Sequence, residues 1–212
     1  MTTEEKIAEI LLNIKAVSLN AKKPYRWVSG ILAPIYTDCR LIMSHPKERR
    51  IVIEEMEKLI EEEISRDMID VIAGVATSGI PHAAWLAEKL DKPLIYARKE
   101  KKDHGKENLI EGKLKKGQKI ILIEDLVSTG GSSVSSIHAI RLGGGILDHQ
   151  ISIFTYELEK SKINFKDLKV KAFPLTNFST LVKVAVDKGY LKQGEKKLVL
   201  AWKEDPENWG KI

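Results

Sequence analysis

Short apolar runs alternate with helical segments through the middle of the chain, and this alternation constrains the fold more than any other feature of the sequence. The expected strands cover residues 69–75, 93–97, 119–123 and 147–156. Helices are expected between them, over residues 81–90 and 132–142. Because strands that alternate with helices form parallel sheets, we predict an α/β fold with a mainly parallel central sheet and flanking helices on both faces.

The two ends of the chain lie outside this alternating region. Residues 3–18 carry apolar side chains at the spacing of one helix face, and residues 25–38 are typical of a hairpin. A helix is expected from Pro46 to about residue 66, and two more helices are expected after about residue 173.

We expect one domain, residues 1–212, with a small hood lobe on a larger core. The hood would combine residues 1–45 with residues 174–212, and the core would cover residues 46–173. The hydrophobic fraction of 43% is sufficient for a sizeable core without disulfide or metal staples.

Composition indicates the cellular location of the protein and the charge of its ligands. The single cysteine, Cys39, cannot form an internal disulfide, which favours a reducing cytoplasmic location. No apolar run has the length of a membrane span, and the early residues Glu4 and Glu5 do not fit a signal peptide. The net charge of +5 suits anionic ligands, either phosphorylated metabolites or nucleic acid.

The segment from residue 120 to 133 carries the strongest chemical signal. An apolar strand runs into two adjacent carboxylates, Glu124 and Asp125, and a loop rich in hydroxyls and glycines then leads into a helix. Ligands of open α/β sheets bind at the carboxyl ends of strands. The backbone N–H groups of such a loop, its hydroxyls and the positive end of the helix dipole suit a phosphate monoester.

The acidic pair restricts the kinds of ligand that this segment can bind. Carboxylates would repel a bare phosphate, so Glu124 and Asp125 need another partner, either two vicinal ribose hydroxyls or a Mg²⁺ ion carried by the ligand. A ribose 5-phosphate unit fits the whole segment. The alternative, an ordinary strand–turn–helix junction, leaves the two carboxylates unexplained, and the spacing of Walker and Rossmann glycine loops does not match.

This segment resembles the fingerprint of type I phosphoribosyltransferases, which bind 5-phosphoribosyl-1-pyrophosphate (PRPP). The resemblance implies the type I phosphoribosyltransferase fold. It also implies that Glu124 and Asp125 bind the ribose, and that Mg²⁺ is held mainly by PRPP, near Asp125. It also implies a set of 5′-phosphate-binding residues: Leu126, Val127, Ser128, Thr129, Gly130, Gly131 and Ser132.

A basic stretch, residues 98–106, follows the strand that ends near Ala97. On composition alone it is a solvated surface loop. Alternatively, its cations close on a departing pyrophosphate and stabilise the negative charge that builds up in the transition state. The stretch matches the catalytic loop of the orotate phosphoribosyltransferase family at these positions: Arg98, Lys99, Lys102, His104 and Gly105.

The resemblance to that family extends over nearly the whole chain. It implies PRPP binding and catalysis by Arg98, Lys102 and His104 together with Asp125, and PRPP binding by Lys99. It also implies a homodimer in which this loop enters the partner's active site. Residues 76–82 resemble the family's pyrophosphate loop.

Two further segments resemble parts of the family's orotate site. The hairpin from Trp27 to Asp38 is similar to the segment that helps enclose orotate, and Ser128 matches the hydroxyl that contacts this substrate. Most other prominent side chains are predicted to pack rather than react: His82, Trp85, Trp202, Trp209 and Cys39.

The expected reaction is transfer of the phosphoribosyl group of Mg-PRPP to orotate, which gives orotidine 5′-monophosphate and pyrophosphate in pyrimidine biosynthesis. One alternative is a phosphoribosyltransferase for a purine base. Another is a non-catalytic PRPP sensor that binds nucleic acid through a basic face. The first 66 residues show neither a helix-turn-helix pattern nor interleaved aromatics and cations, so no nucleic-acid partner is predicted.

Overall fold

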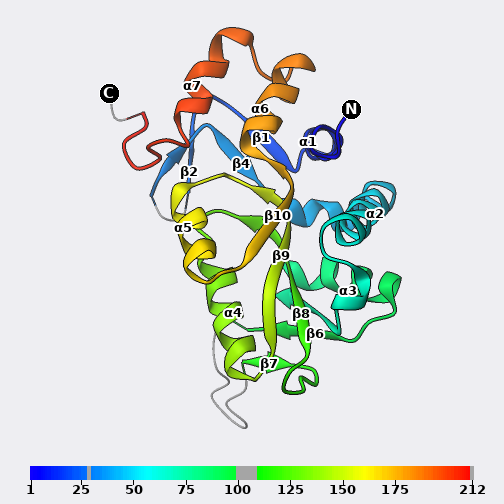
Figure 1. Ribbon diagram of the computed structural model, residues 1–212. Helices are drawn as coiled ribbons and strands as arrows, with labels where there is room; N and C mark the ends of the chain where they lie inside the picture. Colours follow the sequence, from blue (N-terminus) through cyan, green and yellow to red (C-terminus); the bar gives the residue numbers. More distant parts are fainter. Residues whose placement is uncertain (28–29, 99–108, 211–212) are drawn as a thin grey trace.

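The computed structural model describes residues 1–27, 30–98 and 109–210. In this part of the chain a six-stranded sheet has the order β10-β9-β8-β5-β6-β7 (Figure 1). Its strands are β5 (Val71–Val75), β6 (Leu94–Ala97), β7 (Ile110–Glu111), β8 (Lys119–Val127), β9 (Ile146–Thr155) and β10 (Lys171–Asn177). Neighbouring strands are parallel except for β7, which pairs antiparallel with β6. The predicted α/β fold with a mainly parallel sheet is confirmed.

Helices cover both faces of this sheet, with α3 on one side and α4 on the other (Figure 1). The helices are α1 (Thr3–Asn13), α2 (Pro46–Glu63), α3 (Gly79–Leu90), α4 (Gly131–Leu142), α5 (Glu159–Asp167), α6 (Phe178–Asp187) and α7 (Lys196–Ala201). Short 3₁₀ helices are η1 (Cys39–Ser44), η2 (Arg66–Met68) and η3 (Gln193–Glu195). Among the described residues, no helix is both long and apolar enough to cross a bilayer.

Strand β8 shows how the sequence produces two buried faces. Ile121 and Ile123 belong to the apolar cluster on the α3 side, whereas Ile120 and Leu122 belong to the cluster on the α4 side. Successive strand residues point to opposite faces, so a run of apolar residues is stable only when helices cover both faces. The same alternation later separates the two carboxylates at the end of this strand.

The two ends of the chain pack together at one end of the molecule (Figure 1). Helix α1 lies beside α6, and Lys183 Nζ lies 2.7 Å from a carboxylate oxygen of Glu5. Trp202 is fully buried and donates from Nε1 to the carbonyl oxygen of Leu32 at 3.0 Å. The predicted packing roles of Trp202 and of the buried Cys39 are confirmed.

The terminal elements include two small antiparallel pairs. The hairpin expected over residues 25–38 is present as β2 (Tyr25–Arg26) with β3 (Leu32–Ala33). The end of that segment, β4 (Ile35–Thr37), pairs instead with β1 (Val17–Leu19). The helix expected over residues 3–18 was therefore too long. It ends at Asn13, because Lys15 has a φ of 59° and the residues after it form β1.

Two other boundaries differ from the prediction. The loop expected to start at Glu124 begins later, because β8 continues to Val127 through pairing with β9. The helices expected after about residue 173 begin only at Phe178. Residues 171–177 form the edge strand β10, and α5 was not predicted. The division into core and hood at residues 45 and 174 remains a prediction.

Candidate active site

A cavity of about 230 Å³ opens where β5 and β8 end. It has contributions from η1, from the turn after β5 and from the first turn of α4. Its lining residues are Thr37, Asp38, Cys39, Arg40, Val75, Ala76, Thr77, Ser78, Glu124, Asp125, Leu126 and Ser132. The position agrees with the rule that ligands of open α/β sheets bind at the carboxyl ends of strands.

The two adjacent carboxylates belong to the last part of β8. Glu124 is 6% exposed, and one of its oxygens accepts a hydrogen bond from the hydroxyl of Ser133 on α4. Asp125 follows it on the strand and lies near Cys39 and Arg40, on the α3 side of the sheet. The strand alternation thus sends the two side chains toward different supporting elements, and both reach the cavity.

Burial gives Asp125 unusual acid–base behaviour. Its loss of solvent contact raises its pKa from 3.8 to about 6, against the lowering effect of hydrogen bonds from the backbone at Leu126 and at Asp125 itself. The positive charge of Arg40 lowers this pKa, and the negative charge of Asp38 raises it. Asp125 is therefore a carboxylate at neutral pH with an affinity for protons well above that of an ordinary aspartate.

Arg40 was not assigned to the site from the sequence, and Asp38 was included only as the last residue of the hairpin segment expected to help enclose orotate. Asp38 caps η1 through the backbone N–H of Arg40, and the guanidinium of Arg40 returns to both carboxylate oxygens of Asp38. This pairing lowers the pKa of Asp38. An Asp and an Arg two residues apart at the end of a strand were the only local signal. Nothing in the sequence indicated that they would face β8.

The glycine loop after β8 leads directly into the N-terminus of α4. Gly130 has a φ of 79° and occupies the N-cap of α4, a conformation that favours glycine. Because the N-cap is a glycine, it supplies no capping side chain to the first-turn N–H groups of α4, and N–H groups at a helix N-terminus can bind an anion. Asn164 of α5 holds the loop by donating to the carbonyl oxygen of Thr129 at 2.9 Å.

The predicted phosphate-binding residues occupy three different environments. Leu126 and Ser132 line the 230 Å³ cavity itself. Ser128, Thr129, Gly130 and Gly131 form the turn between β8 and the start of α4, beside that cavity. Val127 is buried and instead lines a separate cavity between α5 and strands β9 and β10.

The turn after β5 forms the opposite wall. Ala76, Thr77 and Ser78 line the cavity, and the peptide bond between Ala76 and Thr77 is cis. A Cβ atom on Gly79 would lie 2.5 Å from the carbonyl oxygen of Ile123, so only glycine lets α3 approach β8 this closely. His82 is fully buried at the start of α3, as predicted, and burial lowers its pKa to about 4.

The predicted catalytic loop is described only at its first residue. Arg98 follows β6, and its guanidinium lies 3.2 Å from a carboxylate oxygen of Glu111, the last residue of β7. Lys99, Lys102, His104 and Gly105 lie outside the described residues. Their predicted roles are proposals from the sequence.

The hairpin segment is anchored by aromatic side chains. The Trp27 ring packs 4.9 Å from the Tyr156 ring and 5.2 Å from the Trp202 ring, measured between centroids. Its Nε1 donates to the carbonyl oxygen of Ile35 at 3.2 Å. These contacts hold the N-terminal hairpin against the end of β9, next to the loop that contains Ser128.

The residues present can accept a divalent cation only in part. Within residues 1–27, 30–98 and 109–210, no group of three or more His, Cys, Asp or Glu side chains is placed to hold a metal ion. Glu124 and Asp125 do provide carboxylate oxygens, the ligands that Mg²⁺ prefers. The site therefore fits a cation that arrives with most of its ligands on the substrate.

Comparison with known proteins agrees with this site. A family model described as phosphoribosyl transferase domain matches residues 42–144, which include both cavity-lining turns. The parallel sheet, the acidic pair and the glycine loop thus define a type I phosphoribosyltransferase.

Full-length relatives narrow the class. The chain is 48% identical over 209 residues to an orotate phosphoribosyltransferase of Coxiella burnetii, which covers 99% of each chain. It is 44% identical over 211 residues to that of Listeria innocua, which covers 100% of each. The chain belongs to the orotate phosphoribosyltransferase family.

A solved structure has the same fold. The crystal structure of orotate phosphoribosyltransferase from Aeropyrum pernix superposes with a TM-score of 0.71 at 23% identity, over 86% of this chain and 99% of that one.

Proposed function

We propose that the protein binds PRPP in the 230 Å³ cavity and transfers its phosphoribosyl group to a ring nitrogen of orotate. The products are orotidine 5′-monophosphate and pyrophosphate, in pyrimidine biosynthesis. The observation that carries the choice of reaction is the 48% identity to an orotate phosphoribosyltransferase over almost the whole chain.

The acidic pair binds the ribose. Glu124 and Asp125 accept hydrogen bonds from the vicinal hydroxyls, which holds the sugar with its anomeric carbon toward the incoming base. As the bond to pyrophosphate breaks, the ring gains positive charge. The carboxylate of Asp125 stabilises that charge at short range in a site with little solvent.

The glycine loop binds the 5′-phosphate. Residues 126–132 offer backbone N–H groups and the hydroxyls of Ser128, Thr129 and Ser132, at the positive end of the α4 dipole. This arrangement fixes one end of the substrate while the acidic pair fixes its middle. These contacts position the anomeric carbon for attack by orotate, and the reaction needs no protein nucleophile.

The leaving pyrophosphate is bound from two sides. The turn at residues 76–78 provides backbone donors on one side. The side chains of Arg98, Lys99, Lys102 and His104 close on the other, where their positive charge stabilises the developing anion. Mg²⁺ carried by PRPP would neutralise part of the diphosphate charge, and Asp125 would offer it a carboxylate oxygen.

Orotate is placed between the hairpin and the glycine loop. Ser128 contacts it through its hydroxyl, and the segment anchored by Trp27 encloses it. The catalytic loop belongs to the partner subunit at each site, so the working unit is a homodimer with shared active sites. The single thiol, Cys39, is buried, which fits a protein that works in the reducing cytoplasm.

The test is an ultraviolet assay of orotate consumption with PRPP and Mg²⁺, with hypoxanthine, adenine and uracil as parallel acceptors. We expect consumption of orotate that needs both PRPP and the metal ion. Turnover of a purine base instead would reassign the substrate. PRPP binding without turnover of any base would indicate a PRPP sensor.

A further inference from the structure

Glu124 is held by a chain of two side chains from other elements. The hydroxyl of Ser133 on α4 donates to one of its carboxylate oxygens. The side-chain Nε2 of Gln150, on β9, lies 3.5 Å from the Ser133 oxygen. Ser133 and Gln150 are both fully buried. The three residues form one line, from the middle of β9 to the carboxylate at the end of β8.

The direction of donation along this line follows from chemistry. A serine hydroxyl has one proton, and Ser133 gives it to Glu124, so its oxygen can only accept from Gln150. This fixes which end of the Gln150 amide faces Ser133. The chain of donors therefore ends on the carboxylate, where a hydrogen bond from a hydroxyl is strong because the acceptor is charged.

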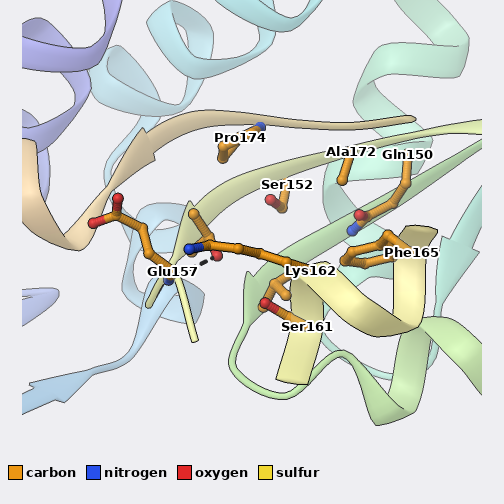
Figure 2. Close-up of a pocket in the computed structure, with 10 residues that line it drawn as sticks. Gln150, Ser152, Glu157, Ser161, Lys162, Phe165, Ala172 and Pro174 are labelled. Atoms are coloured by element: carbon orange, nitrogen blue, oxygen red, sulfur yellow. Dashed lines mark hydrogen bonds between the residues drawn. The ribbon is translucent and has the colours of Figure 1, made fainter. Parts of the chain in front are cut away.

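Gln150 occupies a position that would otherwise be apolar. Its register partners on the two neighbouring strands are Leu122 and Ala172. Its Oε1 is buried and has no hydrogen-bond partner among the described residues. Figure 2 shows Gln150 beside Phe165, and both residues line a cavity of about 180 Å³ between α5 and strands β9 and β10. An unpartnered buried amide oxygen destabilises the fold, so a hydrophobic residue would be better for stability alone.

The need for such support comes from the strand geometry. Glu124 and Asp125 are consecutive, so their side chains leave β8 on opposite faces, yet both must reach hydroxyls of the same ribose. Glu124 has three rotatable side-chain bonds, and only some rotamers bring its carboxylate to the cavity. A fixed donor in the first turn of α4 selects one of them.

We infer that Ser133 and Gln150 are positioning residues for Glu124, an inference that rests on the proposed function. They touch neither substrate. They act by keeping the Glu124 carboxylate aimed at the ribose of PRPP, and Gln150 does so at the expense of stability. Binding and transfer of PRPP depend on them, whereas the orotate contacts do not.

The test compares Ser133→Ala with Ser136→Ala, a buried serine three positions further along the same helix. We expect Ser133→Ala to lower kcat/KM for PRPP about tenfold, with KM for orotate unchanged within about twofold. Ser136→Ala should leave both parameters near wild type. Equal effects of the two substitutions would overturn the inference.

Gln150→Met separates positioning from stability. Methionine has a similar length and removes both the donor and the unpartnered oxygen. We expect kcat/KM for PRPP to fall about threefold, less than for Ser133→Ala because the 3.5 Å contact is long, while the midpoint of thermal unfolding rises. A merely structural role predicts that activity and thermal stability fall together, which would contradict positioning.

A double-mutant cycle identifies Glu124 as the residue through which Ser133 acts. In a Glu124→Gln background, Ser133→Ala should have almost no further effect on kcat/KM for PRPP. The same loss in both backgrounds would refute the inference. If the wild-type protein consumes no orotate, the proposed function fails. The same cycle is then read from PRPP binding by calorimetry, where unaltered binding in Ser133→Ala would refute positioning independently.

Discussion

Arg40 holds Asp38 through two hydrogen bonds, from Nε to Oδ1 at 2.7 Å and from Nη2 to Oδ2 at 2.9 Å, at the rim of the cavity that contains Asp125. The pair places one positive and one negative charge near a carboxyl group whose pKa is already raised by burial. Its members act on that pKa in opposite directions. The acid–base behaviour of the site is therefore tuned by residues 85 or more positions away in the sequence.

Substitution of this ion pair should move the acidic limb of the rate profile. Loss of positive charge in Arg40→Gln raises the pKa of Asp125, so the decline in kcat/KM on acidification should begin at a higher pH. Loss of negative charge in Asp38→Asn lowers that pKa and should shift the limb to lower pH. Rate profiles between about pH 5 and 8 measure both shifts. A shift of the acidic limb in the same direction in both variants would contradict this electrostatic account.

Asp125→Asn should make the protein more stable and less active. The folded-state pKa of about 6 exceeds 3.8, so the folded protein binds more protons than the unfolded chain between these values. Stability contributed by this group therefore falls as pH rises through that window and stays low above it.

Asparagine removes this effect. We expect the free energy of unfolding at pH 7 to rise by about 1–2 kcal/mol, a value reduced for partial solvent contact, and kcat/KM to fall at least about tenfold. Urea unfolding at pH 4 and pH 7 measures the change in the free energy of unfolding. The gain in stability should nearly vanish at pH 4. Full activity in the variant would remove Asp125 from the mechanism.

Gly79→Ala should destabilise the protein although alanine favours helices. The new Cβ would meet the Ile123 carbonyl oxygen at 2.5 Å, so α3 must move away from β8. We expect a loss of about 1–3 kcal/mol in the free energy of unfolding, measured by urea denaturation. Gly194→Ala is the matched control, because its Cβ would meet nothing within 4 Å and should change stability by no more than about 0.5 kcal/mol. A similar loss in both variants would exclude close packing as the cause.

Lys102→Ala should slow the chemical step more than it weakens PRPP binding. A cation that meets charge developing on pyrophosphate contributes mainly in the transition state, so kcat should fall about 10²–10³-fold while the Kd for PRPP changes by no more than about threefold. Lys101→Ala, the neighbouring lysine at a variable position of the motif, should retain activity within about threefold. Steady-state kinetics and calorimetry separate the two quantities. Unchanged turnover in Lys102→Ala would reject its assignment to catalysis.

Shared active sites predict recovery of activity from two inactive variants. Mixing Lys102→Ala with Asp125→Asn, with exchange of subunits, gives heterodimers in which one site has both defects and the other has neither. About a quarter of the wild-type activity should return, because half of the dimers are mixed and each has one intact site. Activity that stays at the level of the separate variants would show that each subunit supplies its own loop.

Much of the site was predictable because it is local in sequence. An apolar strand, two carboxylates and a glycine loop before a helix occupy residues 120–133, and the chemistry of that order indicates ribose 5-phosphate. The limits of β8 were less predictable. Its pairing with β9 extends the strand through Glu124 and Asp125, and such pairing depends on a partner that the local sequence does not specify.

The sequence by itself determined the alternation of strands and helices, the acidic pair, the glycine loop and the basic loop, since each follows from neighbouring residues. Only the tertiary structure decided that Arg40 and Asp38 would face Asp125, and that Gln150 and Ser133 would stand behind Glu124. The physical reason is that hydrogen bonds and electrostatic interactions act through space. Folding brings these residues together from different strands and helices. Their spacing along the chain does not predict that they will be neighbours.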